Sequence, residues 1–293
     1  MSVHLGLDLG GTNLKCAVLD GDGAVLAEAA APNDAEAGED AVLARVVALG
    51  RETAAPHGPI ATAGLGLPGH FDPYGAGLLL PNLPGDWVGR PISGPVGEGL
   101  DVEVRLVNDA RAMTLAELRA GAGRGASDLV CVVLGTGVGG GVAIDGRLHL
   151  GDGHAGEIGH TTVVPDGPLC GCGNRGCLDR VAGAAAIAAQ AGRATVGDAV
   201  EAARAGDERA REAFADAGRH VGVALAGAVV LLWPGRIVVG GGVTAAAGDL
   251  LLGPLRDELR RRACVAPEID VLPAALGAGA GAIGAALWAA ETA

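Results

Sequence analysis

Residues 157–179 read Glu-Ile-Gly-His-Thr-Thr-Val-Val-Pro-Asp-Gly-Pro-Leu-Cys-Gly-Cys-Gly-Asn-Arg-Gly-Cys-Leu-Asp. Four side chains of the kinds that bind metals lie within eighteen residues of this stretch: His160, Cys170, Cys172 and Cys177. Three thiolates and one imidazole form the tetrahedral shell that a structural zinc ion prefers, and the glycines between them allow tight turns. The stretch therefore predicts a zinc knot. Unrelated thiols beside a polar histidine are the alternative.

The composition sets bounds on the rest of the chain. Its 293 residues, 49% of them hydrophobic, favour two globular domains over one. The net charge of −13 argues against nucleic acid or an anionic membrane as partner. We expect no signal peptide, and the longest apolar run, 221–233, is too short to span a bilayer. Cys16, Cys131 and Cys264 are scattered in apolar surroundings, which is typical of buried free thiols in a reducing cytoplasm.

Two segments, 3–21 and 129–146, share one pattern of strand, glycine turn, strand and Asp-Gly hairpin. Such a repeat predicts two similar halves, and hence a two-lobed molecule with a cleft between its lobes. Outside the two segments, strands are predicted at 24–29, 60–67, 102–107, 237–239 and 269–272. Helices are predicted at 40–55, 110–120, 181–192, 195–205, 207–232, about 247–263 and 278–290. A loop rich in Pro and Gly is expected around residues 81–87.

Three of the strands run into glycine turns, which begin at Gly10, Gly135 and Gly240. Consecutive glycines after a strand expose backbone N–H groups that suit phosphate oxygens, although each could be merely a tight turn. A dinucleotide site is rejected, because the G-x-G-x-x-G pattern at Gly135 must open a helix and is followed by a strand. A Walker loop is rejected as well, because the only lysine, Lys15, lies inside a strand.

Two aspartates stand at the ends of predicted strands. Asp8 precedes the first glycine turn, where it could hold hydrated Mg²⁺ against nucleotide phosphates or could simply form the turn. Asp109 follows Asn108 and opens a helix, where it could accept the proton of an attacking hydroxyl or could simply cap the helix. Position in the sequence leaves both alternatives open for each residue.

Together these motifs resemble the ROK family of sugar kinases and sugar-responsive repressors, and the resemblance covers nearly the whole chain. The segment with His160 and the cysteines is its most specific part. The motifs that carry the resemblance are Leu7-Asp8-Leu9-Gly10-Gly11-Thr12 with Lys15, Gly66-Leu67-Pro68-Gly69, Pro81-Asn82-Leu83-Pro84-Gly85, Asn108-Asp109-Ala110, Gly135-Thr136-Gly137-Val138-Gly139-Gly140-Gly141, Glu157-Ile158-Gly159-His160 and Cys170-x-Cys172-Gly173-x-x-Gly176-Cys177.

The resemblance implies an α/β fold of the two-lobed actin-like ATPase (ribonuclease H-like) type. The small lobe would be 1–118, with the helix 279–293 packed back on it, and the large lobe 119–278, with the zinc segment 157–179. It further implies a cytoplasmic homodimer or homotetramer. Because the first phosphate loop begins at Asp8, we expect no DNA-binding helix-turn-helix before it.

The activity that the resemblance implies is ATP- and Mg²⁺-dependent phosphorylation of a hexose, most simply glucose to glucose 6-phosphate, with Asp109 as general base and a structural Zn²⁺. His160 would use one ring nitrogen for zinc and aim the other at the sugar. The implied sugar-binding residues are Gly69, Asn82, Asn108, Asp109, Glu157, His160 and Asp179. The implied nucleotide-binding residues are Asp8, Gly10, Gly11, Thr12, Lys15, Gly135, Thr136, Gly137, Gly240, Gly241 and Gly242.

One residue departs from the family pattern. The family usually has Glu two residues after the last cysteine, where this chain has Asp179, one methylene shorter. The acceptor could therefore be N-acetylmannosamine, N-acetylglucosamine, fructose or mannose, although the loop 82–87 favours an unmodified hexose. A sugar-sensing regulator without turnover is the alternative of another class. It would not need Asp8, Asp109 and Lys15 together.

Overall fold

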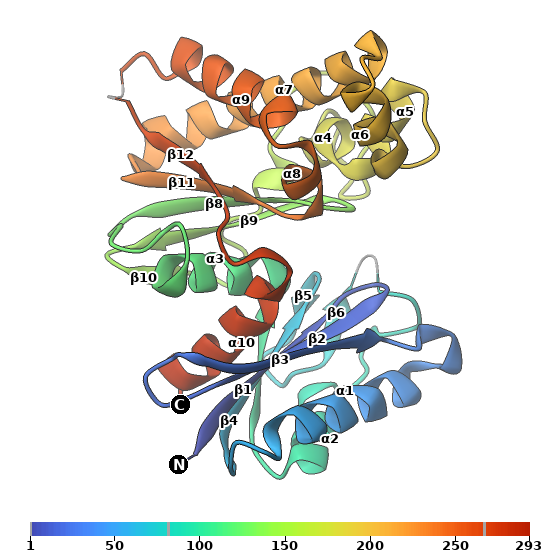
Figure 1. Cartoon of the computed structure of the whole chain (residues 1–293), viewed down its shortest axis with the longest axis vertical. Helices are drawn as coiled ribbons and strands as arrows, with labels where there is room; N and C mark the ends of the chain where they lie inside the picture. The colour runs from blue at the N-terminus through green and yellow to red at the C-terminus, as the bar shows by residue number, and fades with distance from the viewer. Residues whose placement is uncertain (1, 81–82, 266–267) are drawn as a thin grey trace. The chain divides into compact units, whose positions relative to one another are not determined.

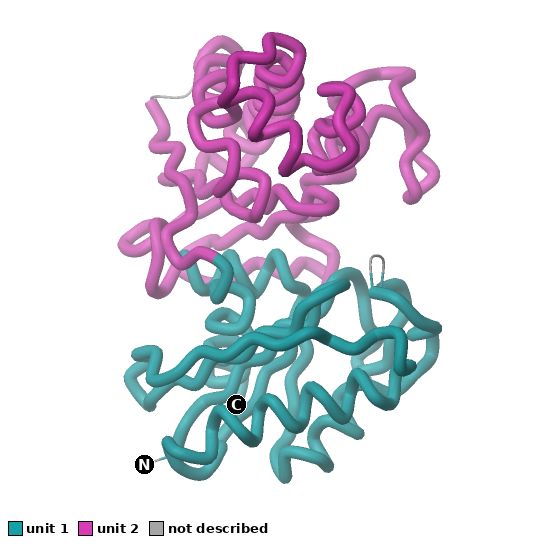
Figure 2. The backbone as a smooth tube through the Cα atoms, turned by 45° about the vertical axis from the view of Figure 1, so that its right-hand side comes forward, with its two compact units in different colours: residues 1–117, 278–293 teal, residues 118–277 magenta. Residues whose placement is uncertain are grey.

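Figure 1 shows the computed structural model of the chain, which describes residues 2–80, 83–265 and 268–293. The chain divides into two compact units (Figure 2). Unit 1 comprises Met1–Glu117 and Ala278–Ala293, and unit 2 comprises Leu118–Gly277. Each unit contains a five-stranded sheet and a hydrophobic core of its own.

Unit 1 is a sheet with helices on both faces. Its sheet has the order β3-β2-β1-β4-β7, in which β2 and β3 are antiparallel neighbours and β4 and β7 run parallel to β1. Its strands are β1 (Val3–Leu9), β2 (Asn13–Leu19), β3 (Val25–Pro32), β4 (Ile60–Leu67), β5 (His70–Phe71), β6 (Gly77–Leu79) and β7 (Val104–Asn108). Its helices are α1 (Glu39–Ala54), α2 (Ser93–Leu100), α3 (Asp109–Ala120, whose last turn enters unit 2) and α10 (Ala280–Glu291).

The sequence of β1 explains how unit 1 packs. Its alternate residues, from Val3 to Leu9, are large, fully buried and clustered with residues of α1 and α2. Helix α10 packs on β1 and β4 (Figure 1), and it lies directly on backbone at two glycines of this sheet, Gly6 and Gly64. A Cβ on Gly6 would lie 1.9 Å from the carbonyl oxygen of Ala282, and one on Gly64 would lie 1.9 Å from that of Ala285. Glycine is therefore required at both positions for α10 to dock.

Unit 2 repeats the arrangement. Its sheet has the order β10-β9-β8-β11-β12, with the same sequence of antiparallel and parallel neighbours. The repeat predicted from the two hairpin segments is thus confirmed. The strands of unit 2 are β8 (Leu129–Leu134), β9 (Val138–Ile144), β10 (Arg147–His149), β11 (Arg236–Gly240) and β12 (Asp270–Pro273). Its helices are α4 (Asp179–Ala182), α5 (Ala184–Ala191), α6 (Val196–Arg204), α7 (Glu208–Leu232), α8 (Gly242–Ala247) and α9 (Asp249–Arg262).

Helix α7 forms the centre of the unit 2 core. It packs closely on α9, because Gly218 places its backbone where a Cβ would lie 2.3 Å from the carbonyl oxygen of Leu251. Its 25 residues, Glu208–Leu232, confirm the helix predicted over 207–232. Among the described residues it is the one helix long and apolar enough to cross a membrane. Many of its residues, including Phe214, Val221 and Leu225, are buried in the core of unit 2.

Several predicted elements need correction. Single helices over 181–192 and 247–263 are wrong, because Gly183 and Gly248 leave the helical conformation and break each segment in two. The loop after β4 is also more structured than expected, since it contains α2 and the short pair β5 and β6. The other predicted strands and helices are confirmed to within a few residues at their ends.

Candidate active site

The first glycine turn, Gly10, Gly11 and Thr12, connects β1 to β2 in unit 1. The amide of Gly10 donates to the carbonyl oxygen of Asn13 over 3.0 Å. The buried side chain of Asn33 holds the turn from outside, since its Nδ2 donates to the Gly10 carbonyl over 2.7 Å. Thr12 is exposed. The turn is thus closed by defined hydrogen bonds rather than by glycine flexibility alone.

Asp8 and Lys15 face each other across the β1–β2 ladder beside this turn. Lys15 Nζ lies 3.7 Å from Asp8 Oδ2. Burial raises the pKa of the Asp8 carboxyl, and the charge of Lys15 opposes that rise. A Cβ on Gly281 would lie 2.5 Å from the same carboxylate, which places Asp8 against the first turn of α10. One carboxylate surrounded by glycine backbone suits a magnesium ion that keeps most of its waters.

Asn108 and Asp109 stand where β7 ends and α3 begins. Asn108 Oδ1 accepts the amides of Ala110 and Arg111 over 3.1 and 3.2 Å, which makes Asn108 the capping residue of the helix. Its Nδ2 donates to the Gly69 carbonyl over 3.3 Å, so the two predicted sugar-binding residues adjoin. Asp109 Oδ1 accepts the neighbouring Ala110 amide over 2.8 Å. The structure therefore brings Gly69, Asn108 and Asp109 together at one sheet edge.

Asn82, also predicted to bind sugar, lies outside the described residues. The residues that follow it are anchored in unit 1. Leu83 and Trp87 are buried in the core, and Trp87 Nε1 donates to the Pro84 carbonyl over 2.8 Å. The carboxylate of Glu39 at the start of α1 accepts the Asp86 amide, which is the main cause of the lowered pKa of Glu39.

The second glycine turn, Gly135, Thr136 and Gly137, connects β8 to β9 in unit 2. The amide of Gly135 donates to the Gly137 carbonyl over 2.9 Å, and the Gly135 carbonyl accepts the amide of Ala184 over 3.0 Å. The turn thus packs against the start of α5. Because the strand β9 follows it, the rejection of a dinucleotide fingerprint is confirmed.

The third glycine segment follows β11. Gly241 has a φ of 91° and approaches β8 so closely that a Cβ would lie 2.2 Å from the carbonyl oxygen of Leu134. Gly240 ends the strand and Gly242 starts α8. The segment therefore lies beside the strand that leads into the second glycine turn.

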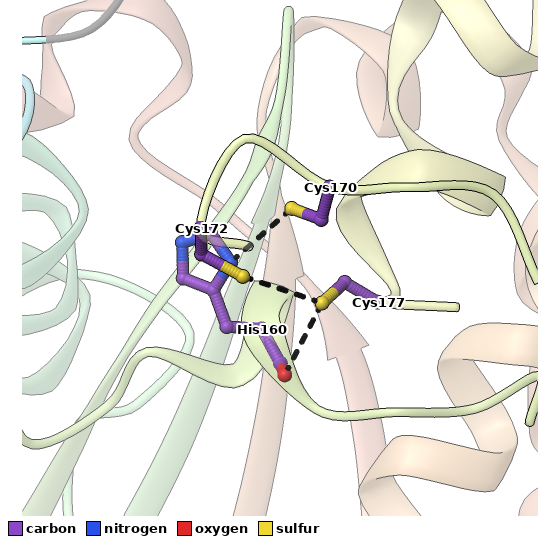
Figure 3. Close-up of side chains that lie close together, drawn as sticks. All are labelled: His160, Cys170, Cys172 and Cys177. Carbon is purple, nitrogen blue, oxygen red and sulfur yellow. Dashed lines mark hydrogen bonds between the residues drawn. The ribbon is translucent and has the colours of Figure 1, made fainter. Parts of the chain in front are cut away.

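The four predicted metal ligands meet in unit 2 (Figure 3). Their ligand atoms all lie within 4.8 Å of one another. His160 Nδ1 lies 3.7 Å from Cys170 Sγ, and Cys172 Sγ lies 3.7 Å from Cys177 Sγ. Figure 3 shows the other ring nitrogen of His160 on the side away from the sulfurs. We call these four residues the metal-ligand cluster.

The chemistry of the cluster fits a zinc ion. Burial, followed by the neighbouring thiols of Cys172 and Cys170, raises the pKa of the Cys177 thiol to about 12. A divalent cation among the sulfurs supplies the positive charge that stabilises such crowded thiolates. Backbone bonds fix the ligand loop, since the amide of Gly173 donates to the Cys170 carbonyl and the amide of Cys170 donates to the Asn174 carbonyl.

Glu157 directly precedes a single 3-10 turn, Ile158–His160, whose last residue is the histidine of the cluster. The turn lies directly on β9, since a Cβ on Gly159 would lie 1.9 Å from the carbonyl oxygen of Val138. Cys177 and Thr162 form an isolated β-bridge that joins the two ends of the cluster segment. His160 itself is exposed.

Asp179 opens α4 and points to the second glycine turn. Its Oδ1 accepts the amide of Val138 over 2.8 Å, and a Cβ on Gly137 would lie 2.5 Å from the same oxygen. This contact and that of Asn33 with Gly10 were not predicted. Each joins a side chain to the backbone of a residue far away in the chain, and neither periodicity nor a motif indicates such a pair.

The comparisons with known proteins agree with these motifs. The family model described as "ROK family" matches residues 4–292. A glucokinase of Thermotoga maritima is 35% identical over 87% of this chain and 86% of its own. An N-acetylmannosamine kinase of Escherichia coli O157:H7 is 34% identical over 97% of each chain.

Solved structures show the same fold. A ROK family glucokinase from Streptomyces griseus, in complex with glucose and AMPPNP, is 32% identical with a TM-score of 0.85 and covers 99% of this chain and 100% of its own. A ROK hexokinase from Thermus thermophilus is 34% identical with a TM-score of 0.86 and covers 99% of this chain and 98% of its own. The chain therefore belongs to the ROK family and has the actin-like ATPase fold of its sugar kinases.

Proposed function

We propose that this chain transfers the γ-phosphoryl group of ATP to a hydroxyl of a hexose, with glucose as the preferred acceptor and glucose 6-phosphate as the product. The observation that carries the proposal is the full-length similarity to a glucokinase solved with glucose and AMPPNP. The identity of 35% with a curated glucokinase supports the same acceptor.

Asp109 is the general base in this proposal. Support comes from its neighbour Asn108, which accepts the amides of Ala110 and Arg111 and so caps α3 even without the Asp109 carboxylate. A carboxylate at that place can draw the proton from the attacking hydroxyl as the phosphoryl group is transferred. The proposed ligands of the other hydroxyls are Gly69, Asn82, Asn108, Glu157 and His160.

The glycine turns are the proposed sites for the nucleotide. The first turn with Lys15 and the second turn would bind phosphate oxygens, and Gly240, Gly241 and Gly242 would lie by the adenosine. Asp8 is the proposed residue for Mg²⁺, which when bound neutralises charge on the transferred phosphoryl group. The metal-ligand cluster would hold structural Zn²⁺ without chemistry of its own, because all four positions of the ion are filled by protein.

An ADP-release assay with ATP, Mg²⁺ and a panel of sugars tests the function. The panel contains glucose, mannose, fructose, N-acetylglucosamine and N-acetylmannosamine, and we expect the highest kcat/KM with glucose. A higher kcat/KM with N-acetylmannosamine would support the second candidate function, an N-acetylmannosamine kinase. The similarity to a curated N-acetylmannosamine kinase favours this candidate. If the protein binds a sugar but releases no ADP from ATP with any sugar of the panel, it is a sensor. A second assay replaces ATP by polyphosphate and measures glucose 6-phosphate, because no ADP is formed from this donor; it shows whether the donor site is restricted to nucleotides.

We also propose a cytoplasmic homodimer or homotetramer that acts on a small molecule and binds no nucleic acid. The net charge of −13 supports the absence of a nucleic-acid partner. Apolar side chains exposed near the end of α7 support self-association: Leu231 is 84% and Trp233 50% exposed. Sedimentation of the purified chain distinguishes a monomer from either assembly.

A further inference from the structure

Asp179 occupies an unusual place between two parts of unit 2. It comes two residues after Cys177 of the metal-ligand cluster, and its carboxylate contacts the turn between β8 and β9. The acceptor atom is 2.8 Å from the Val138 amide, which is an unstrained hydrogen bond to a charged group. Hydrogen bonds of this kind are among the stronger ones in proteins.

Val138 is held from both sides by the segment that carries the cluster. On one side Gly159, next to His160, lies so close that a Cβ there would be 1.9 Å from the Val138 carbonyl oxygen. On the other side Asp179 accepts its amide. The second glycine turn, which precedes Val138, is therefore fixed where it joins β9 by the contacts of Val138 with Gly159 and Asp179.

Gly137 shows how tight this attachment is. A Cβ at this position would lie 2.5 Å from Asp179 Oδ1, so a side chain here would displace the carboxylate from the amide of the next residue. The backbone around Asp179 is fixed as well. The Leu178 amide donates to the Thr161 carbonyl over 2.9 Å, and the Gly183 amide donates to the Asp179 carbonyl over 3.2 Å.

We propose that Asp179 is a positioning residue for the second glycine turn, and hence for nucleotide phosphates, rather than a direct ligand of the sugar. Its carboxylate already has a partner in the turn. The Asp179 side chain places Oδ1 2.8 Å from the Val138 amide. The proposal rests on the proposed function only for the identity of the nucleotide; the attachment of the turn is a property of unit 2 itself.

The test compares Asp179→Ala and Asp179→Asn with the full-length parent. Three quantities are measured: amide hydrogen exchange of residues 135–141, ADP binding and glucose binding, the last two by calorimetry with each ligand alone. For Asp179→Ala we expect faster exchange in this segment and about tenfold weaker ADP binding, with glucose binding unchanged, because a hydrogen bond to a charged group is lost. Asn retains an oxygen at the acceptor position, so Asp179→Asn should keep both the slow exchange and most of the ADP affinity.

Asp128→Ala is the matched control, since Asp128 Oδ1 also accepts a backbone amide, that of Asp145 at the far end of β9. It should leave the exchange of residues 135–141 and both affinities unchanged. Weaker glucose binding with unchanged exchange and ADP binding in Asp179→Ala would overturn the proposal in favour of a sugar ligand. Fast exchange of residues 135–141 in a folded Asp179→Asn would overturn it too. If the parent binds neither ligand, the proposed function fails, while the exchange data still decide the role of Asp179.

Discussion

At the end of β7, Asn108 caps helix α3 and Asp109 is the proposed general base. Because the two roles fall on different residues, the base can be tested without removing the cap. In Asp109→Asn the side-chain oxygen can still accept the Ala110 amide, so the start of α3 should stay intact. The amide cannot take a proton, and we expect kcat to fall by a factor of about 10² to 10⁴. Glucose binding, measured by calorimetry, should persist. Undiminished turnover would remove Asp109 as the base.

Cys172→Ser tests the metal-ligand cluster. A hydroxyl is a poor zinc ligand, so the variant should lose about one zinc per chain, as metal analysis of the purified protein would show. It should also bind glucose more weakly, because His160 loses the ion that orients its ring. Cys264→Ser is the control, and it should leave the metal content unchanged because Cys264 lies outside the cluster. The prediction that Cys264 is buried is wrong, since this cysteine is exposed, whereas Cys16 and Cys131 are buried as predicted. One zinc still bound to Cys172→Ser would contradict the assignment.

Residues differ in how far their roles could be predicted. The metal-ligand cluster could be predicted because its ligands are close in the sequence and of types with few other reasons to gather. The hydrogen bond from Val138 to Asp179 could not, because it joins residues 41 positions apart through a side chain and a backbone amide. Asn33 was missed for the same reason, although its bond to Gly10 closes the first glycine turn.

At the scale of elements, glycines decide both where helices end and how closely they pack. The breaks at Gly183 and Gly248 were not predicted, because a glycine inside an apolar periodic pattern is also compatible with a continuous helix. The strands were easier to predict. Runs such as β1 and β8 are bounded by glycine turns, so their ends are marked in the sequence itself.

Gly218→Ala should disturb the contact between α7 and α9. The new methyl group would lie 2.3 Å from the Leu251 carbonyl oxygen, and overpacking of this kind costs about 1–3 kcal/mol of unfolding free energy. Gly227→Ala in the same helix meets nothing within 4 Å and should instead stabilise the protein by up to about 1 kcal/mol. Chemical denaturation measures both changes. A stabilised Gly218→Ala would show that the two helices can separate at no cost.

Helix α9 also contains an ion pair whose contribution depends on pH. Glu258 is 7% exposed, and hydrogen bonds from Arg261 and Arg262 lower its pKa below the ordinary value of 4.5. The native state thus binds this proton less readily than the unfolded chain does. The stabilisation is present above about pH 4.5 and is lost as the pH falls through the native pKa.

Glu258→Gln should therefore be less stable than the parent at pH 7, and the two unfolding midpoints should converge in acid. Thermal unfolding of both proteins from pH 3 to pH 8 measures the difference. Asp257→Asn is the control, because the pair of Asp257 with Arg260 is largely exposed and should contribute little. A gap that stays constant down to pH 3 would mean that the ionised carboxylate of Glu258 is not what stabilises the helix.

At the scale of the molecule, one sheet topology is used twice, but the two units are assembled from the chain in different ways. Unit 2 is continuous in sequence, whereas unit 1 needs the last sixteen residues, 278–293, to cover one face of its sheet. That face contains Gly6 and Gly64, which have no side chains to shield the backbone once α10 is removed. Buried backbone groups and apolar surface would then meet water.

Removal of residues 278–293 should therefore unfold unit 1 and leave unit 2 folded. Hydrogen exchange is the measurement: the amides of β1 and β4 should exchange fast, while those of β8 and β11 stay protected and the metal-ligand cluster still binds zinc. Gly64→Ala is a milder perturbation of the same contact than the truncation. Its Cβ would lie 1.9 Å from the Ala285 carbonyl oxygen and would push α10 off the sheet. Removal of Ala293 alone, an exposed residue beyond the helix, is the control. Protected β1 amides in the truncated chain would show that the sheet of unit 1 is stable without α10, and that the glycines of its inner face serve only to admit the helix.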